Sequence, residues 1–379
     1  MNLTQGPITP ERVVPARQLA CRLANGIVLD GFAGIPVHFE GNFYWTRPGE
    51  GVVRCADHEF SDYEVAVAHQ RIGNMLEMDE ANRILSFGED ECPENDYQTR
   101  QVYMTLDGHE LEPPECAYLP PTYFDGLAFG GIDKRAVGVY SLFDGLRWSE
   151  SLPVRAVMQR HAISRFHQTI VLVDKARSFY SWDAYTGEVR FRKTAEELGI
   201  AELNVNALGQ TAPLTGKVHI YDNLAIHGGV GAHMVAVDIF TGELCWCVDL
   251  GGGGRGSVVT EDGVVCAVTG GTYYELDACT GAIAKALPVP EPEDMDVLGI
   301  GAISADVTTT HYWGAADRGA LYAVNRETGE IDWWWQDPEW GDAHFDVVVW
   351  DGALFAYGVS LDGKQRTYVF EPEGPAGAA

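Results

Sequence analysis

Val235-Ala-Val-Asp-Ile-Phe-Thr-Gly-Glu-Leu244 is one of four imperfect copies of the same segment. The others are Tyr180-Ser-Trp-Asp-Ala-Tyr-Thr-Gly-Glu-Val189, Tyr274-Glu-Leu-Asp-Ala-Cys-Thr-Gly-Ala-Ile283 and Tyr322-Ala-Val-Asn-Arg-Glu-Thr-Gly-Glu-Ile331. Each copy predicts an alternating strand, an Asp/Asn-x-x-Thr-Gly turn and a second strand. Gly allows the positive φ of a tight turn, and the Asp or Asn can bond the backbone of its own turn. Repeated hairpins of this kind predict an all-β propeller.

The number of blades follows from weaker copies that flank these four. An apolar run after a turn precedes each hairpin, as in Asp262-Gly-Val-Val-Cys-Ala-Val-Thr-Gly270. A four-stranded blade needs about 40–50 residues, so the copies together predict about seven blades. The segment Pro36-Val-His-Phe-Glu-Gly-Asn-Phe-Tyr-Trp45 also alternates, which leaves a count of eight open.

The last repeat is incomplete, because too few residues follow Gly374 to form an outer strand. An unpaired outer edge would invite pairing with other chains. We therefore predict that the N-terminal region, within residues 12–24, closes the ring. The whole chain, 1–379, is predicted to be one propeller domain with an acidic, Pro-rich excursion at 88–121.

Membrane insertion and export are not expected from the sequence. It contains no apolar run of the length that spans a bilayer. The N-terminal region lacks a signal-peptide pattern, because charged residues interrupt each apolar stretch: Arg12, Arg17, Arg22 and Asp30. We therefore expect a cytoplasmic protein.

The eight cysteines lack the paired CxxC spacing of zinc sites. Cys245 and Cys247 lie two residues apart on a predicted strand, with Trp246 on its other face. Free cysteines are commonly buried, so we interpret these thiols as core residues and expect no metal site.

The formal net charge of the chain is −29. Such a charge repels nucleic acid and favours a basic partner. Acidic clusters occur at 89–96 and 291–296. A solvated surface explains each cluster equally well, and so does adaptation of the host to salt.

The hairpin motif resembles the repeat of the PQQ-like, or quinoprotein-type, β-propellers. In that repeat a Trp follows the Thr-Gly turn and docks neighbouring blades, and Val235–Trp246 and Ala323–Trp333 match the pattern. The stretch ending at Trp148 is a degenerate copy, whereas other repeats place Phe191 or Lys285 near the Trp position. The good matches cover about residues 120–375.

The resemblance implies the architecture and says little about function. The family contains quinone-dependent dehydrogenases and non-enzymatic scaffolds. The dehydrogenases often stack their quinone on a disulfide of adjacent cysteines, and this chain has none, so we expect no cofactor. One scaffold member is the lipoprotein that assists outer-membrane barrel assembly, but Cys21 here lacks the apolar leader of a lipobox.

Two places carry residues with catalytic or binding chemistry. His344 and Asp346 fall on one face of a predicted strand, which suits an acid–base or metal pair as well as a structural, hydrogen-bonded His. Arg255 lies in the loop Gly251-Gly-Gly-Gly-Arg-Gly-Ser257, which is either a crossing at the end of a blade or the lip of an anion site.

Aromatic residues are the third group of candidates. Trp340, within Asp337-Pro-Glu-Trp-Gly-Asp342, is predicted to be an exposed anchor, and Trp313 is a further candidate for partner binding. Aromatic anchors inside a charged rim are typical of protein interfaces.

We therefore predict a non-catalytic scaffold that binds a macromolecular partner, expected to be a basic protein. One specific hypothesis is an immunity or inhibitor protein that masks a cationic toxin domain. The alternative is an enzyme, a lyase or hydrolase with or without a metal, whose site at the central channel uses His344, Asp346 and Arg255. A structural subunit of a larger assembly is the third possibility.

Overall fold

The computed structural model describes residues 27–30, 33–56, 62–70, 72–89, 100–112, 121–133, 135–153, 161–174, 176–204, 217–230, 232–252, 256–297, 300–337, 344–350, 352–359 and 365–371.

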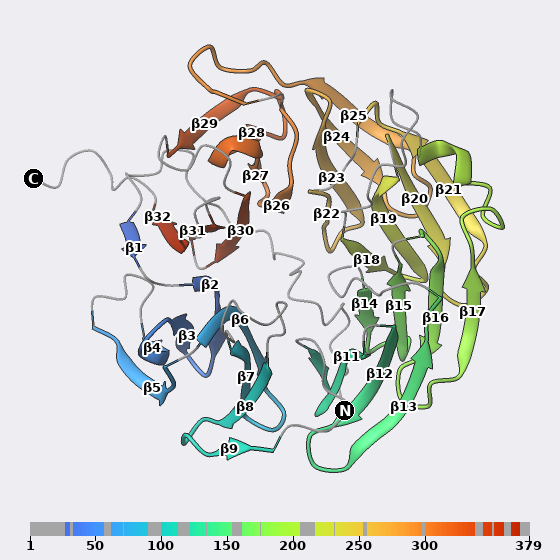
Figure 1. The fold of residues 1–379 in the computed structure, drawn as a ribbon. Helices are drawn as coiled ribbons and strands as arrows, with labels where there is room; N and C mark the ends of the chain where they lie inside the picture. The colour runs from blue at the N-terminus through green and yellow to red at the C-terminus, as the bar shows by residue number, and fades with distance from the viewer. Residues whose placement is uncertain are drawn as a thin grey trace, which may run out of the picture.

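Eight four-stranded antiparallel sheets stand around a central axis as the blades of a propeller (Figure 1). The all-β architecture predicted from the repeats is confirmed, and of the two blade counts the structure has eight. The stretch 36–45 lies within the first two strands of blade 1, so it belongs to the additional blade. The blades are numbered in chain order, with the strands given from the axis outwards.

Blades 1 to 4 each use four consecutive strands. Blade 1 contains β2 (Ala33–Phe39), β3 (Asn42–Arg47), β4 (Gly51–Cys55) and β5 (Glu64–Ala68). Blade 2 contains β6 (Ile72–Asp79), β7 (Ile84–Glu89), β8 (Arg100–Thr105) and β9 (Glu110–Leu111). Blade 3 contains β10 (Thr122–Phe124), β11 (Leu127–Asp133), β12 (Ala136–Ser141) and β13 (Gly145–Ser151). Blade 4 contains β14 (His161–Ser164), β15 (Thr169–Val173), β16 (Phe179–Asp183) and β17 (Val189–Lys193).

Blades 5 to 7 repeat this order. Blade 5 contains β18 (Val218–Tyr221), β19 (Leu224–Val230), β20 (His233–Asp238) and β21 (Leu244–Asp249). Blade 6 contains β22 (Val258–Val259), β23 (Val264–Thr269), β24 (Thr272–Asp277) and β25 (Ile283–Pro288). Blade 7 contains β26 (Ser304–Val307), β27 (His311–Ala315), β28 (Ala320–Asn325) and β29 (Ile331–Gln336). Two short 3-10 helices, η2 (Ala201–Asn204) and η3 (Asp317–Gly319), complete the elements.

Blade 8 joins the two ends of the chain. It contains β30 (His344–Trp350), β31 (Ala353–Val359) and β32 (Gln365–Phe370), and its outer strand is β1 (Ile27–Asp30), which pairs antiparallel with β32. In Figure 1 the blue β1 therefore lies beside the red β32. Closure of the ring by the N-terminal region is confirmed. The closing strand begins just after residues 12–24, which lie outside the described residues.

The predicted excursion at 88–121 overlaps blade 2. Its residues 100–105 and 110–111 form β8 and β9, the outer half of that blade. Residues 90–99 and 113–120 of this stretch lie outside the described residues. No helix in the described part of the chain has the length and apolar character needed to cross a bilayer.

The Asp-x-x-Thr-Gly turns form as predicted. Asp183 Oδ1 accepts hydrogen bonds from the amides of Tyr185 and Thr186, at 3.1 and 2.9 Å. The glycine of each turn has a positive φ, which is 74° at Gly187 and 79° at Gly329. Because each turn is stabilised by its own side chain, hairpin geometry is encoded locally.

Neighbouring blades are joined by a hydrogen bond to the carbonyl that follows the turn Asp. Trp148 Nε1 of blade 3 donates to Ala184 O of blade 4 at 3.1 Å. Trp246 Nε1 of blade 5 donates to Ala278 O of blade 6 at 3.0 Å. The docking role that the family resemblance implies for the Trp is thus present at these two junctions.

Two junctions without this Trp use another donor for the same carbonyl. Lys285 Nζ of blade 6 donates to Arg326 O of blade 7 at 2.7 Å. Blade 4 has Phe191 at the Trp position, and there Ser181 Oγ on the adjacent strand donates to Ile239 O of blade 5 at 2.6 Å. Apolar clusters between the sheets form the core around these bonds.

Candidate interaction surface

In each of blades 1 to 7, two of the three turns between strands lie at the same end of the propeller. Within an antiparallel blade, the turn between the first and second strands lies at the same end as the turn between the third and fourth. We call this end, in blades 3 to 6, the turn face. Its turns are residues 125–126, 142–144, 165–168, 184–188, 222–223, 239–243, 260–263 and 278–282.

Large apolar side chains gather on the turn face. Phe143, Phe166 and Phe240 lie in its turns and are 65%, 51% and 40% exposed. Three further exposed residues, Leu146, Val189 and Ile283, begin the strands that follow its turns. Among the described residues, six of the seven exposed large apolar side chains therefore lie at this face, and the seventh is Val65 of blade 1. Such a concentration is typical of interaction sites.

Contacts across the junction of blades 4 and 5 hold part of this surface in place. The ring of His167 lies 4.8 Å from that of Phe166 and 5.4 Å from that of Phe240. The guanidinium carbon of Arg190 lies 4.9 Å from the centre of the Phe240 ring. Arg190 also donates to the His167 carbonyl at 3.1 Å. The contacts with His167 and Arg190 therefore hold the Phe240 side chain in place, although it is 40% exposed. A side chain that is already ordered loses less conformational entropy when a partner binds.

A similar contact links blades 3 and 4. The Tyr185 hydroxyl donates to Asp125 of the neighbouring blade, and the Tyr185 ring lies 5.8 Å from that of Phe124. Burial and the bond to Asp125 raise the pKa of Tyr185 to about 12. The phenol therefore remains a neutral donor at physiological pH.

The turn face also carries exposed carboxylates. Exposed acidic residues on the same turns are Asp125, Asp144, Glu188, Asp222, Glu243, Glu261, Asp262 and Asp277. The nearby cations are engaged: Arg147 lies 3.0 Å from Asp144, Arg165 lies 3.5 Å from Asp125, and Arg190 lies 3.3 Å from Asp183. The turn face thus combines exposed apolar side chains with carboxylates on the same turns.

The residues predicted from sequence to bind a partner lie elsewhere. Trp313 is in β27, where it is fully buried and its ring lies 6.0 Å from that of Trp333. It belongs to the core between blades 7 and 8, so it cannot present a surface to a partner, and its expected binding role is corrected accordingly. Trp340 and Arg255 lie outside the described residues.

The predicted pair His344 and Asp346 lies two residues apart on β30, the inner strand of blade 8. Asp346 is exposed, and the side chain of His344 lies outside the described part of the structure. The described residues contain no group of three or more His, Cys, Asp or Glu side chains that could hold a metal ion.

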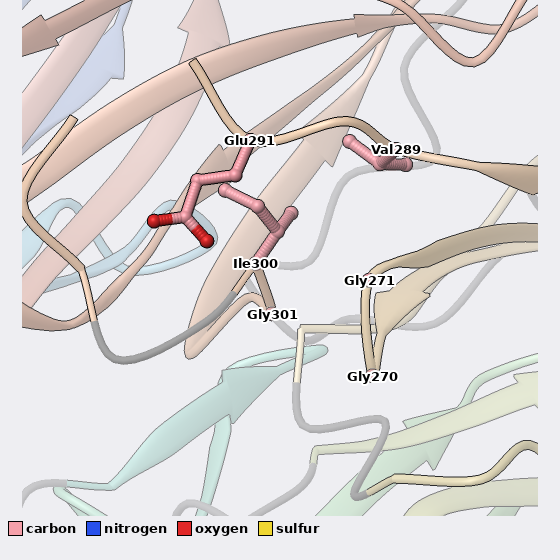
Figure 2. A pocket seen from close by; sticks show the side chains of 6 residues that line it. All are labelled: Gly270, Gly271, Val289, Glu291, Ile300 and Gly301. Carbon is pink, nitrogen blue, oxygen red and sulfur yellow. The ribbon is translucent and has the colours of Figure 1, made fainter. Parts of the chain in front are cut away.

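A pocket of about 450 Å³ opens at the opposite end of blade 6. Figure 2 shows its lining by Gly270, Gly271, Val289, Glu291, Ile300 and Gly301. The Gly-rich loop 251–257 joins β21 of blade 5 to β22 of blade 6, and the amide of Gly256 donates to Ala302 O at 3.0 Å. Among the described residues that line the pocket, Glu291 is the one with a charged side chain.

Sequence reasoning missed the apolar residues of the turn face. Phe143, Phe166 and Phe240 occupy variable turn positions, where an apolar side chain has no core to enter. A Phe at the second variable position of the Asp-x-x-Thr-Gly motif, as at Phe240, was a signal available in the sequence.

Comparison with known proteins supports the fold assignment. Residues 202–338 match the family model for the outer membrane protein assembly factor BamB. The crystal structure of BamB from Moraxella catarrhalis superposes with a TM-score of 0.56 at 11% identity, covering 94% of this chain and 99% of that one. The computationally designed Ika8 protein superposes with a TM-score of 0.59 at 13% identity, covering 89% and 96%. None of the curated proteins matches.

These comparisons confirm the resemblance to PQQ-like repeat propellers that the hairpin motif predicted. The identities are low, so the similarity to the two solved structures concerns the fold.

Proposed function

We propose that this protein is a non-catalytic scaffold that binds a protein partner through the turn face. The observation that carries the proposal is the group of exposed apolar residues on four consecutive blades, with exposed carboxylates on the same turns. Interfaces commonly place aromatic anchors inside a polar rim. The BamB-like fold agrees with a scaffold role.

The partner that fits this surface is basic. The chain carries a net charge of −29, and the arginines beside the turn face are already paired with carboxylates. Electrostatic attraction of this kind speeds association and weakens as salt rises. An immunity or inhibitor protein that masks a cationic toxin domain is one specific version of this proposal.

We also place the protein in the cytoplasm. The five cysteines in the described residues are free thiols. Cys55 and Cys266 are buried, but Cys245, Cys247 and Cys279 are exposed, so the interpretation of Cys245 and Cys247 as core residues is wrong. Exposed free thiols suit a reducing compartment. Fractionation of the native cells with compartment markers tests this assignment.

Site-specific photocrosslinking in the native host tests the binding surface. A benzophenone amino acid replaces Phe143 or Phe240, and the control replaces Val65, which is similarly exposed on blade 1. We expect one basic protein to crosslink from both turn-face positions and not from position 65. We also expect the yield to fall at high salt.

A companion variant separates binding from folding. Phe166→Ser with Phe240→Ser should abolish the complex without lowering the melting temperature by more than a few degrees, because both side chains are exposed. Equal crosslinking from position 65, or a complex unaffected by the double substitution, would refute binding through the turn face.

A further inference from the structure

The junction between blades 2 and 3 contains a cluster of buried polar side chains. Cross-strand pairing places Glu77 of β6 opposite Ser86 of β7, and Ser86 opposite Tyr103 of β8. Side chains opposite each other share one face of the sheet. Gln101 lies two residues before Tyr103 on β8, so it belongs to the same face.

Blade 3 completes the cluster with two tyrosines. The hydroxyls of Tyr103 and Tyr140 lie 3.1 Å apart across the junction, which identifies this face of blade 2 as the one toward blade 3. Tyr123 of β10 is close enough to Glu77, Asp79 and Ser86 to feel their charge or dipole.

Several polar atoms in this cluster are buried without a hydrogen-bond partner. Both amide atoms of Gln101 are in this position, whereas Ser86 Oγ and Tyr123 Oη have only each other within reach and satisfy no stricter hydrogen-bond geometry. Ser86, Tyr123 and Gln101 are only 1%, 6% and 3% exposed. A buried polar group without a hydrogen-bond partner destabilises the folded state, so several of them in one junction indicate a missing occupant.

The charge at the junction is negative. Burial raises the pKa of Glu77 to about 7, so a cation beside this carboxyl would favour its ionised form. Asp79, on the same face of β6, is buried and is engaged by Asn82 through its amide N–H at 3.2 Å and its side-chain nitrogen at 2.7 Å. Glu77 is half-buried and belongs to β6, the inner strand of blade 2.

We propose that this junction binds a hard divalent cation, with calcium as the best match, through Glu77, Ser86, Gln101 and Tyr123. These four side chains each offer an oxygen among the apolar residues of the junction, and calcium accepts carboxylate, amide and hydroxyl oxygens together with water. A divalent charge balances the two carboxylates of Glu77 and Asp79. The ion would thereby link blades 2 and 3.

Calcium titration of the chelator-treated protein tests the site. We expect calcium to raise the melting temperature and calorimetry to resolve one site that is tighter than the surface carboxylates. Glu77→Gln should weaken this site by about tenfold or more, as loss of a charged ligand typically does. Tyr123→Phe, which removes one neutral ligand, should weaken it less.

Glu80→Gln is the matched control. Glu80 is exposed in the turn after β6, so this variant removes the same charge near the same strand and should keep the wild-type response. Sodium at the same concentration should produce no shift. An equal calcium response in the Glu77 and Glu80 variants, or no response in the wild type, would overturn the proposal, and the second result would assign the orphaned atoms to buried water.

Discussion

A single backbone carbonyl, the one after the turn Asp or Asn, accepts the bond that joins successive blades. Its donor is Trp148 or Trp246 at two junctions, Ser181 at a third and Lys285 at a fourth. The chemical identity of the donor varies, and in blade 4 so does the strand that carries it, whereas the acceptor is always the carbonyl after the turn Asp or Asn. A buried carbonyl requires a partner, which explains why replacement of the Trp elsewhere is accompanied by another donor.

Removal of a donor should therefore destabilise its junction. We expect Trp246→Phe and Ser181→Ala each to cost about 1–3 kcal/mol, because Ala278 O or Ile239 O would be left unsatisfied. Urea unfolding measures the loss, with Val65→Ala as the exposed control. If the free energy of unfolding falls less in these variants than in Val65→Ala, water has replaced the lost donor.

The turn glycine is also constrained by the neighbouring blade. A Cβ at Gly281 would lie 2.7 Å from Cδ2 of Trp246, and the φ of Gly281 is 69°. Gly281→Ala should lower the melting temperature more than Gly145→Ala, where φ is 80° and a Cβ meets open space. Thermal unfolding of both variants separates the clash from the backbone strain that they share. Equal losses would argue that the clash is relieved.

At the scale of elements, the hairpins depend on ionised turn carboxylates. Hydrogen bonds from the hydroxyl and amide of Thr280 lower the pKa of Asp277 below its ordinary value. A lowered folded-state pKa contributes stability that is present above the unfolded pKa and is lost as pH falls through the folded one. This hairpin should therefore weaken below about pH 4.

Substitution by Asn tests that dependence. Asn325 accepts the corresponding backbone bonds in blade 7, so Asp277→Asn should keep the turn while removing its titration. We expect the melting temperature of the variant to fall less steeply than that of the wild type between about pH 4 and 2.5. Parallel slopes would assign the acid sensitivity to other carboxylates.

These elements also show how far prediction from sequence extends. Turn chemistry is local, so Asp183 and Gly187 identified their hairpin without any tertiary information. The solvent exposure of a side chain is not determined by the local sequence, because it depends on which other blades or turns lie next to it in the fold. Trp313 therefore entered the core, whereas Phe143 in a turn remained exposed. The cluster around Gln101 depends on two blades meeting, which no single repeat encodes.

At the scale of the whole molecule, β1 protects the outer edge of blade 8. Deletion of residues 1–30 should leave β32 unpaired, and we expect concentration-dependent association of the shortened chain. Light scattering measures this, and a chain that starts at residue 25 keeps β1 as the matched control. Two monodisperse monomers would show that the edge tolerates exposure.

Pairing of β1 with β32 also imposes an order on biosynthesis. Within the propeller, β1 is translated before every other strand and must wait for β32, which is translated after all the others. Blades 1 to 7 each consist of consecutive strands and can form as they appear, but blade 8 cannot. The ring of a nascent chain therefore remains open until β32 has left the ribosome. A closed ring can form only after translation has reached the last blade.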